Sequence, residues 1–249
     1  MARYETSLQC IGQAALECGL VANPAISNPY AASGVDPAVQ QMTGLLNSVG
    51  RELLGMREWQ RMIVSYTLTV AMGDTGFYSL PADYGRHVDQ TDWNPSNRLP
   101  LGGPLTAQDY TYLLATNLAS STIYISFREK DGQFVILPQP PPVGQVITFE
   151  YNSRYWICAS GAPTVLAKDA PTAPDDILMF EPVLIQKLLK LRFKEAKGFD
   201  TSAATQQFNN AMMAWGGMDK SAPVLSAARS RGFPYIDDRN VPETNYGLP

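Results

Sequence analysis

Few residues in this sequence are of types that could do chemistry, and their spacing matches no catalytic motif. The only histidine is His87, so a Ser-His-Asp or Cys-His arrangement would have to use it. No nucleophile elbow, phosphate-binding loop or dinucleotide-binding glycine motif occurs in the 249 residues. Asp169, Asp175 and Asp176 could form an acid–base pair, but their proline- and alanine-rich surroundings are typical of solvated turn residues. We therefore predict that the protein is not an enzyme.

Cysteine usage leads to a similar conclusion about metals. Cys10, Cys18 and Cys158 are an odd and sparse set, which argues against a disulfide framework and fits a reducing compartment. Cys10 and Cys18 lie about two helical turns apart, and we interpret them as small buried side chains. Zinc is not expected because no second pair of ligands follows them. The sequence predicts neither a metal nor another cofactor.

A row of lysines is the one charge pattern in the sequence that could bind a ligand. The four residues are spaced 3-4-3, so on a helix they share one face. One interpretation is a solvated basic face that complements the helix dipole. The other is a stripe that contacts nucleic-acid phosphates without sequence preference. The four residues are Lys187, Lys190, Lys194 and Lys197.

The elements that position these residues begin with two helices, expected at residues 4–20 and from Asp36 to about residue 56. Asp36 is a good N-cap, and Pro37 follows at the first helical position. Three glycines in the second helix weaken its intrinsic helix propensity. This helix is therefore expected to depend on close packing for its stability. The glycines are Gly44, Gly50 and Gly55.

The second helix also carries an apolar seam at 3-4-3-4 spacing. Such a seam suits packing along another helix, in the same chain or between subunits, and an ordinary core face is the simpler interpretation. The seam consists of Val39, Met42, Leu46, Val49 and Leu53.

After residue 60 the hydrophobic period changes from that of a helix to that of a strand. Tyr66, Leu68 and Val70 alternate with hydroxyl residues, and residues 146–151 alternate in the same way. The Asp131-Gly132 pair predicts a two-residue hairpin turn. Residues 61–158 are therefore expected to form an antiparallel β module.

The C-terminal part is expected to return to helices. The strongest helix should begin at Asp175 or Asp176 and end at Gly198, with Pro182 marking either its first turn or a kink. Further helical pieces are expected at 201–215 and 219–231.

From residue 232 the chain lacks the apolar residues for a core, and it forms either a frayed terminus or an extended arm that binds a neighbouring subunit. Its apolar anchors would be Phe233, Tyr235 and Ile236, and its polar contacts Asp237, Asp238 and Arg239.

These elements predict an α+β fold, in which N- and C-terminal helices form a bundle around an inserted β module, followed by an extended arm. The expected parts are 1–60, 61–158, 159–231 and 232–249. With 45% hydrophobic and 17% charged residues the chain can build a core, and a net charge of −4 argues against a basic nucleic-acid binder. No apolar run approaches the roughly 20 residues of a membrane helix, and no apolar segment follows the N-terminus as in a secretory signal.

Seven strings, in this order and spacing, make the chain resemble a known family, the head-to-tail adaptor (connector) proteins of tailed bacteriophages, most like those of short-tailed phages. The resemblance covers residues 38–198. The strings are LLGMREWQ at 53–60, FYSLPADY at 77–84, DWN at 92–94, LPLGGPLTAQDY at 99–110, FVILPQP at 134–140, TFEYNSRYW at 148–156 and LRFKEAKGFD at 191–200.

The resemblance implies a virion structural protein of the phage neck, folded and assembled in the host cytoplasm. It implies a homo-oligomeric ring of about twelve copies beneath the portal protein, closed by heterologous contacts. Such a ring extends the channel for double-stranded DNA and docks a tail or nozzle protein. In that setting the arm would contact the portal or a neighbouring subunit, and the lysine row would line the channel.

Other classes of protein stay open at this point. Aromatic residues in and beside the β module, among them Trp93, Tyr124, Tyr155 and Trp156, would suit a carbohydrate- or receptor-binding module. Another virion or scaffold protein is the second alternative. An enzyme built on Asp or Glu pairs is the third, and it would require a cleft with paired carboxylates.

Overall fold

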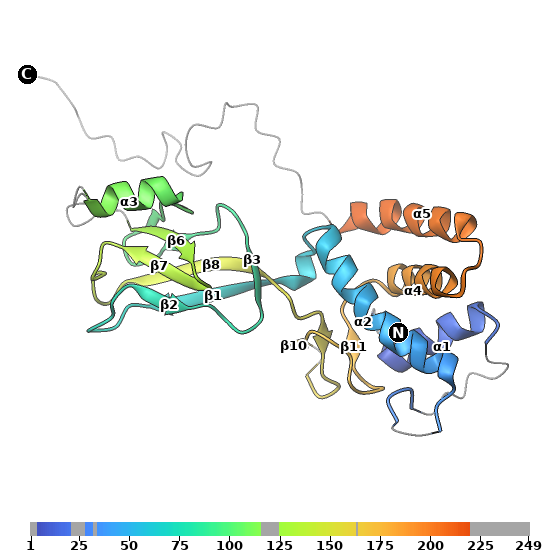
Figure 1. The fold of residues 1–249 in the computed structure, drawn as a ribbon. Helices are drawn as coiled ribbons and strands as arrows, with labels where there is room; N and C mark the ends of the chain where they lie inside the picture. Colours follow the sequence, from blue (N-terminus) through green and yellow to red (C-terminus); the bar gives the residue numbers. More distant parts are fainter. Residues whose placement is uncertain (1–3, 21–27, 32–33, 116–124, 163, 220–249) are drawn as a thin grey trace, which may run out of the picture. The chain divides into compact units, whose positions relative to one another are not determined.

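The computed structural model describes residues 4–20, 28–31, 34–115, 125–162 and 164–219 (Figure 1). It is an α+β protein of helices and small antiparallel sheets, as the sequence predicts. Its helices are α1 (Ser7–Glu17), α2 (Pro37–Met56), the 3-10 turn η1 (Gln60–Met62), α3 (Ala107–Ala115), α4 (Pro182–Lys197) and α5 (Ser202–Met218). Its strands are β1 (Ile63–Thr69), β2 (Phe77–Ser79), β3 (Tyr84–His87), β4 (Trp93–Asn94), β5 (Leu99–Pro100), β6 (Ser126–Lys130), β7 (Gln133–Leu137), β8 (Val146–Ser153), β9 (Ile157–Cys158), β10 (Leu166–Lys168) and β11 (Ile177–Leu178).

Capping residues set the starts of the first two helices. Thr6 and Gln9 form a reciprocal capping box at α1, so this helix begins at Ser7, three residues later than its apolar pattern predicts. At α2 the Asp36 carboxylate accepts from the Ala38 amide at 2.7 Å, and Pro37 occupies the first turn. The predicted start of the second helix is confirmed.

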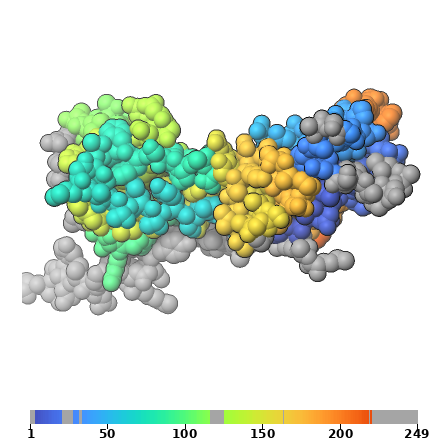
Figure 2. Space-filling model, turned by 90° about the horizontal axis from the view of Figure 1, so that it is seen from below, coloured from blue at the N-terminus to red at the C-terminus, as the bar shows by residue number. Residues whose placement is uncertain are grey.

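Helices α1, α2, α4 and α5 share one hydrophobic core with the sheet β10-β9-β11. Leu46 and Leu53 from α2 pack there with Leu184 and Leu188 from α4, and all four are fully buried. The sheet adds Ile157 and other apolar side chains to this core. Figure 2 shows segment 164–178, in yellow to orange, lying against the blue N-terminal helices. Its strand β11 forms a β-bridge with Thr6, so the N-terminal segment joins this sheet.

The β module has its own core between two sheets. One follows the order β1-β8-β4-β5, with β3 also paired to β8, and the other follows β2-β7-β6. Along β8 every second side chain is buried, including Ile147, Phe149 and Tyr151, which confirms the predicted alternation. The Asp131-Gly132 turn joins β6 and β7 with both residues at positive φ, as a tight hairpin requires.

The predicted start of the strongest helix at Asp175 or Asp176 is wrong, whereas the alternative, with Pro182 in its first turn, is confirmed. Residues 177–178 form strand β11 paired with β9, and α4 begins only at Pro182. Asp176 does not cap the helix, and it is not a solvated turn residue. Its carboxylate is buried and binds the Lys168 ammonium at 2.8 Å, so it does not accept hydrogen bonds from the first amides of α4. The predicted end of this helix is confirmed, because Gly198 takes the left-handed conformation with φ 73°.

Candidate interaction surface

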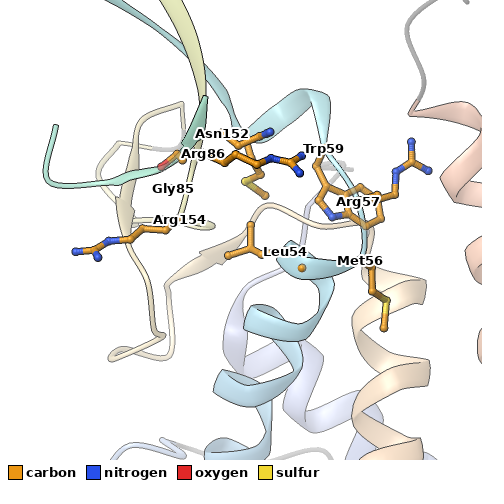
Figure 3. A pocket seen from close by; sticks show the side chains of 11 residues that line it. Leu54, Met56, Arg57, Trp59, Gly85, Arg86, Asn152 and Arg154 are labelled. Carbon is orange, nitrogen blue, oxygen red and sulfur yellow. The ribbon is translucent and has the colours of Figure 1, made fainter. Parts of the chain in front are cut away.

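A cleft of about 380 Å³ lies where α2 leads into β1 and where β8 leaves the β module (Figure 3). Apolar side chains from the end of α2 and from η1 form part of its lining, with Trp59 and Met62 both buried. The polar part of the lining comes from β3 and β8. The lining residues are Leu54, Gly55, Met56, Arg57, Trp59, Met62, Gly85, Arg86, Asn152, Ser153 and Arg154.

Three arginines and no carboxylate stand among these lining residues. Arg57 lies over the Trp59 ring at 4.9 Å and donates to the Gly216 carbonyl. Arg86 reaches from β3 and forms an exposed ion pair with Glu58 beside the cleft. Arg154 lies exposed at the outer margin and points away from Trp59, and its guanidinium has no ion pair within the described residues. The cleft therefore combines an apolar surface with an excess of positive charge.

Local sequence explains why β3 and β8 meet closely at this cleft. A Cβ on Gly85 would lie 2.7 Å from the Asn152 carbonyl oxygen, so only glycine allows this approach. Next to it the register of β3 against β8 shifts between residues 84 and 86. The Asp83 carboxylate accepts from the hydroxyls of Tyr151 and Ser153 and thereby fixes the end of β8.

The sequence did not single out the three arginines as a site. They stand 29 and 68 residues apart along the chain, and no helical or strand period relates them. Only the pairing of β3 with β8, next to the end of α2, brings them to one cleft. A register prediction for these two strands would have been the signal needed to find the cleft.

The predicted lysine stripe is divided by an ion-pair cluster. Lys187 and Lys190 both bind the Glu17 carboxylate of α1 at 3.1 Å, with their side chains 27% and 18% exposed. Burial alone would raise the pKa of Glu17, but the hydrogen bonds from both lysines outweigh it and hold the pKa below its ordinary value. Lys194 and Lys197 make no ion pair with a carboxylate of the described residues. The unneutralised charge of the stripe is therefore concentrated in the last turn of α4.

The apolar seam of α2 lies inside the core of its own chain. All five seam residues are buried, in contact with the helical core described above. One glycine of this helix confirms the expected close packing, because a Cβ on Gly50 would meet the Trp156 ring at 2.1 Å. Gly44 and Gly55 have no heavy atom within 4 Å of that position. The seam therefore packs within its own chain and not between subunits.

The aromatic residues that suggested a carbohydrate site are not gathered on a surface. Trp156 is fully buried, and its indole nitrogen donates to the Asp169 carbonyl oxygen at 2.7 Å. Trp93 is half-buried in β4. Tyr124 lies outside the described residues. So do the predicted helical piece at 219–231, from residue 220 on, and the C-terminal arm with its six named residues.

The single histidine is part of a buried polar pair. His87 Nε2 lies 2.9 Å from Asp92 Oδ2, and its ring packs against Phe127 and Phe149. Burial opposes the charged imidazolium, but the hydrogen bond and charge of Asp92 outweigh it and raise the pKa of His87 above its ordinary value. A histidine buried inside the β module and bound to the Asp92 carboxylate is suited to holding β3 against the β4 region.

Within the described ranges, no group of three or more His, Cys, Asp or Glu side chains is arranged to hold a metal ion. None of the described helices is both long and apolar enough to cross a membrane.

Comparison with known proteins identifies the family of this chain. The family model described as SU10 adaptor protein matches residues 11–231, which include both cores and the cleft. No curated protein matches the chain. The chain therefore belongs to the SU10 adaptor protein family, the structural adaptors that join head and tail components in the neck of a phage virion.

Proposed function

We propose that about twelve copies of this chain form a ring beneath the portal, where they extend the channel for double-stranded DNA and dock the tail or nozzle protein. The family match over most of the chain carries this proposal. Folding and assembly take place in the host cytoplasm.

The outer face of α5 supports the proposal with a surface suited to contacts between copies. No charged residue occurs between Ser202 and Met218, and the exposed side chains include Gln206, Asn209 and Asn210. Met213 is 77% exposed on the same helix. An uncharged amide face can be covered by a neighbour without the cost of removing a charge from water. A closed ring needs such a surface on every copy.

Electron microscopy of the purified protein mixed with portal rings tests this function. We expect a stacked, axially symmetric complex in which added density continues the portal channel, and counting the subunits in that density checks the copy number. A protein that stays monomeric beside the portal and binds glycans would favour the carbohydrate-binding module instead. Portal rings incubated with an unrelated acidic protein of similar size are the control.

We propose that the C-terminal arm binds the portal or an adjacent subunit of the ring, so its removal is expected to abolish portal attachment. Phe233, Tyr235 and Ile236 would act as apolar anchors, and aromatic anchors in pockets contribute about 2 kcal/mol or more each. A chain ending at residue 231 should keep the circular dichroism spectrum and melting temperature of the full chain, because the described core ends before it. Co-sedimentation with portal rings measures attachment. If the chain ending at residue 231 attached to portal rings as well as the full chain does, the arm would have no role in attachment.

The last turn of α4 is expected to matter for DNA in the channel. We propose that the four lysines of α4 line the DNA channel, with Lys194 and Lys197 as the two charges that no described carboxylate neutralises. The double substitution Lys194→Glu/Lys197→Glu should leave ring assembly intact and impair DNA retention or ejection, since each contact with a phosphate is electrostatic. Lys130→Glu, at the β6–β7 turn, is the control. A cryo-EM map that places α4 on the outer wall of the ring would exclude the role.

A further inference from the structure

We propose that the arginine cleft receives residues 233–238 of a neighbouring copy, so that each subunit of the ring clasps the next by its C-terminal arm. This inference rests on the proposed ring. It commits the arm to one site on one partner, where the sequence left the portal and a neighbouring subunit as alternatives.

The chemistry of the cleft selects a particular kind of segment. Leu54 and Met56 offer an apolar surface, with Met56 39% exposed. Arg154 and Arg86 stand exposed at its margin, and Arg86 is also paired with the exposed Glu58. Because no carboxylate lines the cleft, its positive charge attracts an anionic segment and rejects a basic one. A peptide with an apolar part followed by carboxylates would satisfy both the surface and the margin.

The arm carries that combination in six consecutive residues. The string FPYIDD at 233–238 places an aromatic and aliphatic part directly before Asp237 and Asp238. Arginine binds carboxylates through paired N–H donors, so two adjacent carboxylates suit two guanidinium groups at the margin. No segment of the described chain already fills the cleft, which keeps its volume of about 380 Å³.

The geometry of a ring explains why the occupant comes from a neighbour. A closed ring uses heterologous contacts, in which one surface of a subunit meets a different surface of the next. The cleft and the arm are two such unlike and complementary surfaces on one chain. Thirteen residues lie between Asp219 and Phe233, and the fourteen Cα-to-Cα steps, fully extended, reach about 46–50 Å. This length allows the arm to pass from one subunit to the next.

Photo-cross-linking in assembled rings tests the contact directly. The full chain with p-benzoylphenylalanine at position 235 is mixed with an equal amount of unmodified chain labelled with ¹⁵N, assembled on portal rings and irradiated. We expect cross-linked peptides that join an unlabelled arm to a labelled segment at residues 54–62, 84–87 or 151–155. Cross-links to the portal, or only within the unlabelled chain, would overturn the proposal. Absence of rings in the unmodified protein would count against the proposed function and not against this contact.

Charge reversal tests whether the arginines are responsible. Arg86→Glu/Arg154→Glu should lower the yield of these cross-links about tenfold, because two attractions become repulsions. Adding Asp237→Arg/Asp238→Arg to the same chain should restore the yield, which a merely structural effect of the first pair could not do. Arg98→Glu/Lys130→Glu makes the same change of net charge elsewhere on the exposed surface and should leave the yield unchanged. Equal yields in all four proteins would overturn the role of the cleft.

Discussion

Replacing Gly50 with alanine is expected to destabilise the protein by about 3 kcal/mol, the upper part of the range for overpacking a core. The added Cβ would lie 2.1 Å from the Trp156 ring, far inside van der Waals contact. Neither partner can move easily, because Gly50 is in the middle of α2 and Trp156 is fully buried with its indole N–H bound to Asp169. Urea unfolding followed by tryptophan fluorescence measures the change as a lower midpoint with an unchanged slope.

Gly44→Ala is the matched control, because it makes the same chemical change in the same helix. Gly44 is exposed, and no heavy atom lies within 4 Å of its Cβ position. Alanine there should stabilise the protein by about 0.5–1 kcal/mol through higher helix propensity and a more restricted unfolded chain. The two substitutions are thus expected to have opposite signs. A stabilising Gly50→Ala would show that α2 does not approach Trp156 as the structure places it.

Replacing Asp176 with asparagine is expected to cost about 2–3 kcal/mol, the scale of hydrogen bonds to a buried charge. Its carboxylate is 2% exposed and accepts from Lys168 at 2.8 Å and from the amides of Thr172 and Ala173 at 2.8 and 2.9 Å. Its main-chain oxygen accepts from the Ser7 amide, so the same turn holds the start of α1. Thermal unfolding should therefore show a lower midpoint. Asp175→Asn, at an exposed neighbour, should change stability by less than about 0.5 kcal/mol.

The contribution of Asp176 should also depend on pH. Burial alone would raise the pKa of Asp176, but the hydrogen bonds from Lys168 and the two amides outweigh it, so the folded-state pKa lies below the ordinary value of 3.8. The stabilisation is therefore complete above pH 3.8 and is lost as the pH falls through the folded-state pKa. Unfolding curves of the wild type and of Asp176→Asn should converge below about pH 4. A difference that stays constant down to pH 2 would contradict this assignment.

Features encoded within a few neighbouring residues were predictable. The start of α2 at Asp36 and Pro37, the turn at Asp131-Gly132 and the stop at Gly198 all depend on local backbone preferences that the residue types carry with them. The alternation of β8 was predictable for the same reason. These features gave the α+β class without any tertiary information.

The start of α4 shows where this local reasoning fails. Asp176 has the chemistry of an N-cap, yet its carboxylate accepts from the Lys168 ammonium and from the amides of Thr172 and Ala173, not from the first amides of a helix. Pairing of β11 with β9 then keeps residues 177–178 extended. A long-range partner overrode a local preference, and that partner is visible only in the folded chain.

The helical and strand periods of the sequence define which residues share a face. Which partner that face contacts depends on the tertiary structure. The lysines of α4 share one face through the helical period, but Glu17, 170 residues from Lys187, neutralises two of them. The α2 seam faces its own chain because α1 and α4 cover it. Arg57, Arg86 and Arg154 form a cleft because strand register joins distant segments. Periodicity is a property of neighbouring residues, whereas charge neutralisation, burial and clefts depend on contacts between segments that only folding brings together.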